Sequence, residues 1–274
     1  MKICLDAGHG AGYNPSPADP AYREGTRMFD LQKYLKAALE RYGIEVVCTR
    51  KTVDDCPSLY ERGVMSRGCE LLLSLHTNAV AGERNDTVDY VRVYYPVSRR
   101  GQALAQALSE VIASVMGTSQ QPQFVVRYNG AGNADYYGVI RYAAAVGTCG
   151  MILEHSFHTH PRTTAWLLSD ENLQLLAEAE AALIAEYYGL EEPEMRYELL
   201  KDVKSEFYRP TLEKLLKLDI LRGKGGEGGT HGKGSGCSGK AEDGRDGKDG
   251  ADGQRGDFLY VVADVDSFIE QLFK

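Results

Sequence analysis

The first 190 residues switch repeatedly between two patterns of apolar positions. Short apolar runs typical of buried strands occupy residues 2–5, 44–49, 70–76, 90–95 and 148–154. In the intervening stretches apolar residues return every three or four positions, which predicts helices over 29–42, 58–67, 101–116 and 172–188. Strands that alternate with crossover helices predict an α/β fold with three layers, in which a mainly parallel, mixed sheet lies between helices.

The remainder of the chain follows a different pattern. Residues 1–190 are long enough to form one complete hydrophobic core, and the acidic, proline-containing stretch 191–197 is typical of a linker. Residues 198–274 then predict a small α+β module with helices near 210–220 and 266–273 and a strand at 258–262. Wall binding and self-association are both open as its role.

A glycine-rich insertion interrupts this C-terminal module. Residues 223–256 contain 14 of the 30 glycines, and from Gly244 to Gly256 a glycine stands at every third position. Four triplets without proline are too few for an isolated collagen-like helix, and the regularly spaced aspartates do not follow the EF-hand pattern. We therefore expect a flexible linker or loop.

Composition excludes several classes of function. The chain carries 39 acidic and 31 basic residues, a formal net charge of −8, so it has no basic footprint for nucleic acid. No apolar run approaches the roughly 20 residues of a membrane-spanning helix. Six cysteines are scattered without a CxxC pair, which favours reduced thiols. The first residues enter a strand directly with no signal-peptide pattern, so we expect synthesis in the cytoplasm.

Three side chains with metal-binding chemistry stand at the ends of predicted strands. His9, His76 and Glu154 each follow or end an apolar run. The carboxyl ends of parallel strands meet at one edge of a sheet, where ligands of α/β proteins gather. Two imidazoles and a carboxylate at that edge match a catalytic zinc site. Taken singly, each histidine is also consistent with a hydrogen-bonding loop residue, and Glu154 with a solvated or salt-bridged acid.

Glu24 is a fourth candidate for this edge. It lies between a glycine- and proline-rich loop and the first predicted helix, so it can fold back toward the strand ends. Its neighbours Arg23 and Arg27 offer the alternative of a surface salt bridge.

The order and spacing of several short motifs resemble one enzyme family. The motifs are Asp6-Ala7-Gly8-His9-Gly10, Glu24, Cys48-Thr49-Arg50, Leu59 with Arg62, Ser74-Leu75-His76-Thr77-Asn78-Ala79 and Ile152-Leu153-Glu154. As a set, over about residues 1–190, they are similar to the zinc-dependent N-acetylmuramoyl-L-alanine amidases of the Amidase_3 type.

The resemblance implies a cofactor, a substrate and residue roles. Zn²⁺ would be held by His9, Glu24 and His76, with Glu154 as the catalytic acid/base. The substrate would be peptidoglycan, cleaved at the amide between the lactyl group of N-acetylmuramic acid and L-alanine. Two alternatives stay open: a zinc hydrolase of the same fold that acts on another amide or peptide, and a catalytically inactive protein that binds the cell wall.

Some residues depart from the family pattern or are open to more than one role. After Glu154 the chain reads His155-Ser156-Phe157-His158-Thr159-His160. These three histidines are open to hydrogen-bonding, substrate-binding or second-metal interpretations, and His155 lies nearest the metal if the segment forms a loop. Arg141 is a candidate partner for a peptide carboxylate or for a structural ion pair, and Asn78 is a further substrate-binding candidate.

The C-terminal region bears on where the enzyme acts. Residues 208–228 resemble C-terminal modules of phage-encoded lysins. Together with the missing signal-peptide pattern, this favours an endolysin that degrades the cell wall after release or non-classical export.

Overall fold

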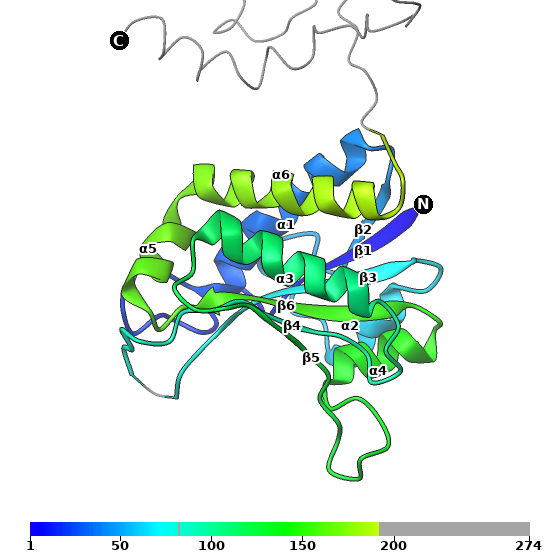
Figure 1. The fold of residues 1–274 in the computed structure, drawn as a ribbon, viewed down its shortest axis with the longest axis horizontal. Coiled ribbons are helices and arrows are strands. Elements are labelled where there is room, and N and C mark those ends of the chain that lie inside the picture. The colour runs from blue at the N-terminus through cyan, green and yellow to red at the C-terminus, as the bar shows by residue number, and fades with distance from the viewer. Residues whose placement is uncertain (82, 192–274) are drawn as a thin grey trace, which may run out of the picture. The chain divides into compact units, whose positions relative to one another are not determined.

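The fold is seen in a computed structural model that describes residues 1–81 and 83–191 (Figure 1). Its strands are β1 (Lys2–Ala7), β2 (Glu45–Cys48), β3 (Leu71–Asn78), β4 (Arg92–Tyr94), β5 (Gln123–Val125) and β6 (Cys149–Phe157). The linker from residue 192, the module at 198–274 and the insertion at 223–256 lie outside the described residues, and the interpretations made for them stay predictions.

The strands form one mixed sheet in the order β2-β1-β3-β6-β4-β5. β2, β1, β3 and β6 are mutually parallel, whereas β4 runs antiparallel to β6 and parallel to β5. The mainly parallel, mixed sheet predicted from the sequence is therefore confirmed.

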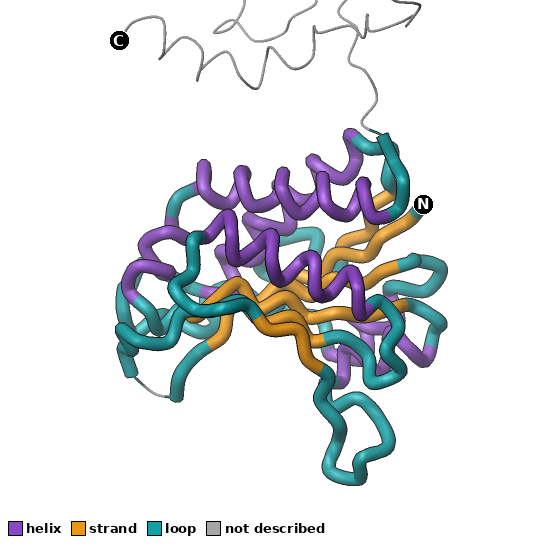
Figure 2. Tube along the Cα trace, in the orientation of Figure 1, coloured by secondary structure: helices purple, strands orange, loops and turns teal. Residues whose placement is uncertain are grey.

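Helices cover both faces of this sheet (Figures 1 and 2). The helices are α1 (Glu24–Arg41), α2 (Leu59–Met65), α3 (Gln102–Met116), α4 (Gly138–Ala145), α5 (Pro161–Leu168) and α6 (Asp170–Tyr187). The apolar sides of α1, α3 and α6 pack on the face that carries Leu5, Leu73 and Leu153. α4 packs on the opposite face against Leu72 and Ile152. The three-layer expectation is confirmed for the described residues.

The structure differs from the predicted elements mainly at their ends. α1 begins at Glu24, five residues before the predicted start, although its N-cap Arg23 makes no side-chain capping bond. Without a capping residue the sequence contains no start signal there. β6 continues to Phe157, three residues beyond the predicted end. β5, α4 and α5 were not predicted, because three to eight residues are too short for a clear periodicity.

Hydropathy agrees with the composition on one further point. Within residues 1–81 and 83–191, no helix combines the length and apolar character needed to cross a bilayer.

Candidate active site

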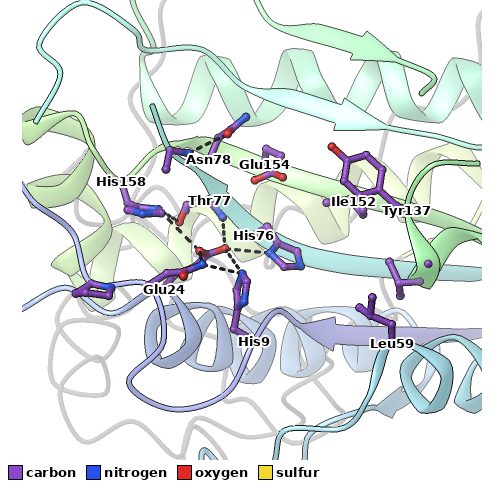
Figure 3. A pocket seen from close by; sticks show the side chains of 15 residues that line it. His9, Glu24, Leu59, His76, Thr77, Asn78, Tyr137, Ile152, Glu154 and His158 are labelled. Atoms are coloured by element: carbon purple, nitrogen blue, oxygen red, sulfur yellow. Dashed lines mark hydrogen bonds and ion pairs between the residues drawn. The ribbon is translucent and has the colours of Figure 1, made fainter. Parts of the chain in front are cut away.

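The carboxyl ends of β1, β3 and β6 meet at one edge of the sheet, as parallel neighbours must. His9 lies two residues after β1, His76 lies near the end of β3, and Glu154 lies three residues before the end of β6. Glu24 reaches the same place from the first residue of α1. The structure thus brings together all four residues that the sequence singled out (Figure 3).

Three of these side chains form a compact cluster. One ligand atom each from His9, Glu24 and His76 lies within 4.8 Å of the others. Glu24 Oε1 is 3.0 Å from His76 Nδ1 and 3.4 Å from His9 Nε2, and it also accepts a hydrogen bond from the Thr77 backbone N–H at 2.9 Å. Asn14 Nδ2 donates to Glu24 Oε2 at 2.8 Å. The carboxylate is only 1% exposed, so this geometry fixes it between the two imidazoles.

Glycine is required where the loop after β1 passes the cluster. A Cβ on Gly8 would lie 2.3 Å from the His76 ring, which is too short for a contact between non-bonded atoms. A Cβ on Gly25 would likewise lie 1.8 Å from the Gly10 carbonyl oxygen, so α1 can approach the loop only through a residue without a side chain. Gly8 of the first motif therefore allows the backbone to lie against the His76 imidazole.

Two buried arginines hold the same loop by its carbonyl groups. Arg50 donates to the carbonyl oxygens of Gly8 at 3.2 Å and Gly25 at 2.7 Å. Arg62 donates to the His9 carbonyl at 2.5 Å and forms a buried ion pair with Asp6 at 2.7 Å. The two arginines explain structurally why Cys48-Thr49-Arg50 and Arg62 accompany the histidine motifs: they position His9.

The electrostatics of the cluster attract a cation. Burial by itself raises the pKa of Glu24, but the hydrogen bonds and charges of His76 and His9 outweigh it and hold the pKa well below its ordinary value. Burial likewise works to lower the pKa of His76, yet the neighbouring Glu24 raises it to about 9. An ionised carboxylate between two imidazoles is thus favoured here.

The donor set fits a divalent metal such as zinc. Imidazole nitrogen and carboxylate oxygen are both ordinary zinc ligands, and three protein ligands leave a fourth position for solvent or substrate. In the absence of a metal the negative charge of Glu24 draws a proton to His76, and a cation bound among the same atoms would take that proton's place.

Glu154 stands beside the cluster but outside it. It lies directly opposite His76 in the parallel pairing of β3 with β6. Its Oε2 atom is buried without a hydrogen-bond partner in the structure. Burial, followed by the charge of Glu24, raises the pKa of Glu154 to about 7 against the opposing effect of His76. A carboxyl group that titrates near neutrality can both accept and donate a proton.

The cluster and Glu154 open into a cavity of about 500 Å³. His9, Glu24 and His76 line it together with Asn14, Pro15, Leu59, Thr77, Asn78, Ala79, Tyr137, Gly138, Val139, Ile152, Glu154 and His158. A cavity of this size accommodates a ligand of the size of a sugar or a short peptide segment.

The remaining predicted residues are distributed differently. Asn78 lines the cavity, whereas the Arg141 guanidinium donates to the backbone carbonyls of Asp135 at 2.7 Å and Tyr136 at 2.5 Å. Arg141 therefore braces the loop before α4 and is not among the cavity-lining residues. Its role toward substrate stays a prediction.

His155 occupies a position that corrects the loop expectation. Because β6 continues past Glu154, consecutive side chains point to opposite faces, and His155 is fully buried under α6. Its Nδ1 lies 2.9 Å from the His76 carbonyl oxygen and its Nε2 lies 2.8 Å from Glu180 Oε1. His155 thus does not lie on the cavity side, and direct contact with substrate has no support in this geometry.

His158 and His160 separate into two roles. His158 is 5% exposed, lines the cavity, stacks on Tyr22 with ring centroids 5.7 Å apart and lies 2.9 Å from Thr77 Oγ1. Its Nδ1 is 3.9 Å from Glu24 Oε2, so it buttresses the cluster. His160 is the N-cap of α5, where its side chain accepts from the Thr163 N–H. Sequence reasoning missed Asn14 and left His158 open, since neither carries a signal beyond its residue type.

A cluster of candidate metal ligands beside a buried carboxyl group is an arrangement found in metal-dependent hydrolases. The family comparison makes this specific: residues 3–186 match the model of the N-acetylmuramoyl-L-alanine amidases of the Amidase_3 type, and the chain belongs to that family. It is thus an amide hydrolase of the class that acts on peptidoglycan. Among curated proteins, none matches the chain significantly.

Solved structures show the same fold at low sequence identity. An N-acetylmuramoyl-L-alanine amidase from Clostridium difficile 630 is 22% identical, with a TM-score of 0.58 over 69% of this chain and 96% of that one. The catalytic domain of CwlV from Bacillus (Paenibacillus) polymyxa is 20% identical, with a TM-score of 0.57 over 69% and 99%. Cwp6 from Clostridium difficile is 21% identical, with a TM-score of 0.57, and this chain spans only 29% of its length.

Proposed function

We propose that this protein uses zinc to hydrolyse the amide bond between N-acetylmuramic acid and L-alanine in peptidoglycan. Membership of the amidase family supports the reaction class. One structural observation carries the assignment of roles: Glu154, with a buried unpaired oxygen, lies directly opposite His76 of the His9–Glu24–His76 cluster.

His9, Glu24 and His76 would hold the metal. When bound there, zinc supplies a Lewis acid that polarises the scissile carbonyl and makes water more acidic near neutral pH. The Thr77 N–H and the Asn14 amide fix the orientation of the Glu24 carboxylate, and Arg62 fixes the loop that presents His9. These bonds preorganise Glu24 and the loop that carries His9, while the His76 ring is oriented by Glu24 itself.

Glu154 would move the proton. In its ionised form it accepts a proton from the attacking water, and it then donates that proton to the nitrogen of the departing L-alanine. The second transfer is essential, since an amide nitrogen leaves only when it is protonated. The raised pKa of Glu154, about 7, suits both steps at neutral pH.

The test is an end-group assay on purified peptidoglycan. The protein, loaded with zinc, should release free L-alanine amino termini, and a chelator should abolish the release while added Zn²⁺ restores it. His76→Ala should lose both the metal and the activity. New reducing sugar ends, new amino termini at other stem residues, or no products at all would reject the proposal in favour of another hydrolase or an inactive wall-binding protein.

The proposal extends to a lysin-like role. Its support is the likeness of residues 208–228 to phage lysin modules, which is a matter of sequence alone. Protein added from outside should lower the turbidity of a suspension of susceptible cells, and Glu154→Gln should not. Cleavage of soluble wall fragments, without any effect on intact cells or isolated walls of the tested hosts, would contradict this role.

A further inference from the structure

One row of side chains crosses the sheet beyond Glu154. Glu154 lies opposite His76 on one side and opposite Arg92 on the other, and Arg92 in turn lies opposite Gln123. Residues directly opposite each other in a sheet present their side chains to the same face. Arg92 is therefore the neighbour of the candidate acid/base on the side away from the metal cluster.

The Arg92 guanidinium is held in place without a carboxylate. It donates to Tyr90 Oη at 2.5 Å, to Tyr94 Oη at 3.1 Å and to Gln123 Oε1 at 2.7 and 3.0 Å. The Cζ atom of Arg92 also lies 5.0 Å from the centre of the Tyr90 ring. These contacts use four of the five N–H groups, and one Nη1 hydrogen is left for a ligand.

A second arginine extends the same surface toward the cavity. Arg127 lies 3.7 Å above the Tyr136 ring and donates to Tyr137 Oη at 3.1 Å. Tyr137 lines the cavity (Figure 3). Its ring packs on the Tyr94 ring with centroids 4.6 Å apart. The arginine–tyrosine surface, as we name it, comprises Tyr90, Arg92, Tyr94, Arg127, Tyr136 and Tyr137.

The charge of this surface is not neutralised by the protein. Residues 90–142 contain five arginines and no lysine against two acids, Glu110 and Asp135, in a chain whose net charge is −8. Within the described part of the chain, neither Arg92 nor Arg127 lies within salt-bridge distance of a carboxylate. Arginine on tyrosine rings is oriented and partly desolvated, which prepares it to bind a carboxylate.

The direction of proton transfer assigns this surface to one half of the substrate. Glu154 must reach the amide nitrogen, so the peptide that carries this nitrogen leaves on the Glu154 side of the metal cluster. The next strand on that side is β4, with Arg92. Resting on the proposed function, we infer that the arginine–tyrosine surface binds the stem peptide through its free carboxylates and sets the preference for acidic over amidated stems.

The chemistry of the two substrate halves favours the peptide as the occupant. A stem peptide carries free carboxylates on its glutamate residue and at its end, and the guanidinium group matches a carboxylate in geometry and charge. The glycan half offers uncharged hydroxyl and acetamido groups, which cannot neutralise the charge of two arginines.

The first experiment compares two soluble muramyl peptides that differ only at the second stem residue. One carries D-glutamate with a free α-carboxylate and the other the amidated form. The wild-type enzyme should show a kcat/KM at least about tenfold higher for the acidic form. Arg92→Gln and Arg127→Gln should each reduce this ratio toward one. Arg67→Gln, at an exposed position near the opposite end of β3, is the matched control and should keep the ratio.

The second experiment separates this inference from the proposed function. Binding of the free stem peptide and of a peptide-free glycan strand to full-length Glu154→Gln is measured by calorimetry, with and without Arg92→Gln. Arginine-dependent binding of the acidic peptide supports the inference even if no muropeptide is cleaved, a result that would reject only the amidase proposal. Equal binding and cleavage of acidic and amidated peptides, or arginine-dependent binding of the glycan instead, overturns the inference.

Discussion

Glu154 and His76 lie directly opposite each other on parallel neighbouring strands, so the candidate acid/base and a candidate metal ligand share one face at the same depth of the sheet. This register follows from the pairing of Leu71 with Cys149 five residues earlier and is fixed by the two central strands. The candidate acid/base and one of the three candidate metal ligands are therefore held by the same pair of hydrogen-bonded strands.

Replacement of the carboxyl group should separate metal binding from turnover. Glu154→Gln keeps the shape of the side chain but cannot exchange a proton, so kcat should fall by about 10²–10⁴-fold. The zinc content should stay at the wild-type level, because Glu154 is not in the cluster. Metal analysis and the end-group assay check this together, and a zinc-loaded Glu154→Gln protein with full activity would rule out the assigned role.

The titration of Glu154 should be visible in the metal-free protein. Burial raises its folded-state pKa to about 7, above the unfolded value. The folded state therefore binds this proton more tightly, and stability falls as pH rises from the unfolded pKa through about 7. Carboxyl-labelled NMR should place the midpoint near 7, and Glu154→Gln should remove that part of the pH dependence of thermal unfolding. Added zinc should lower the midpoint, since a nearby cation favours the ionised form. A midpoint near 4 without metal would contradict the burial argument.

Gly8 offers a test of the metal site that leaves every ligand in place. A methyl group at this position would collide with His76 at 2.3 Å, so Gly8→Ala should displace the ring and weaken zinc binding by at least about tenfold. The matched control is Gly130→Ala, where the added carbon meets nothing within 4 Å and the backbone angle is ordinary. Competition with a zinc-binding dye measures both variants. Unchanged affinity in Gly8→Ala would show that the loop yields to the extra atom.

Loss of one member of the buried His155–Glu180 pair should destabilise the fold, whereas replacement of both members by apolar residues should not. Both side chains are fully buried, and the Glu180 charge helps to raise the pKa of His155 against its burial. Glu180→Ala leaves the buried Nε2 of His155 without its hydrogen-bond partner and should cost about 1–3 kcal/mol in the free energy of unfolding. The double change His155→Phe with Glu180→Leu should recover most of that loss. Urea unfolding of the wild type, Glu180→Ala and the double variant decides, and a double variant no more stable than Glu180→Ala would contradict this prediction.

Asp89, which bonds to Ser156 of β6, should give the stability of the fold the opposite pH dependence. Burial works to raise its pKa, but hydrogen bonds from Ser156, the Ser119 N–H and Thr163, with the charge of Arg162, lower it. A lowered carboxyl pKa stabilises the fold above the unfolded value near 4 and loses this contribution as pH falls through the folded pKa. Asp89→Asn should therefore be less stable than wild type at pH 7, by about 1–3 kcal/mol, with a difference that shrinks below about pH 4. A constant difference from pH 7 to 3 would disprove the linkage.

Much of the candidate site was predictable because it lies at the ends of strands. Apolar runs before His9 and His76 and up to Glu154 located three parallel strands, and the carboxyl ends of such strands converge. The sequence also indicated that the glycines around His9 allow a close approach of the backbone. It took the structure to show that Gly8 is in contact with the His76 ring.

The features that the sequence could not predict depend on register and on exact strand ends. His155 was expected nearest the metal if residues 155–160 formed a loop. Instead β6 continues for three more residues and places His155 on the other face, because consecutive side chains of a strand point to opposite faces. The pairing of Arg92 with Glu154 was also hidden: it requires β4 to run antiparallel to β6, and a three-residue strand carries no sign of its direction.

That reversal of β4 has a consequence for how the enzyme can change over time. The candidate metal ligands come from the loop after β1, from β3 and from α1. Arg92, Arg127 and Tyr137 instead belong to β4 and to the segment between β5 and α4, at the far side of the sheet. The loop between β5 and α4 at this edge can be lengthened, shortened or exchanged without moving the central strands. If the arginine–tyrosine surface binds the stem peptide, substrate preference can therefore change at one side of the sheet while the candidate metal ligands and Glu154 stay unchanged.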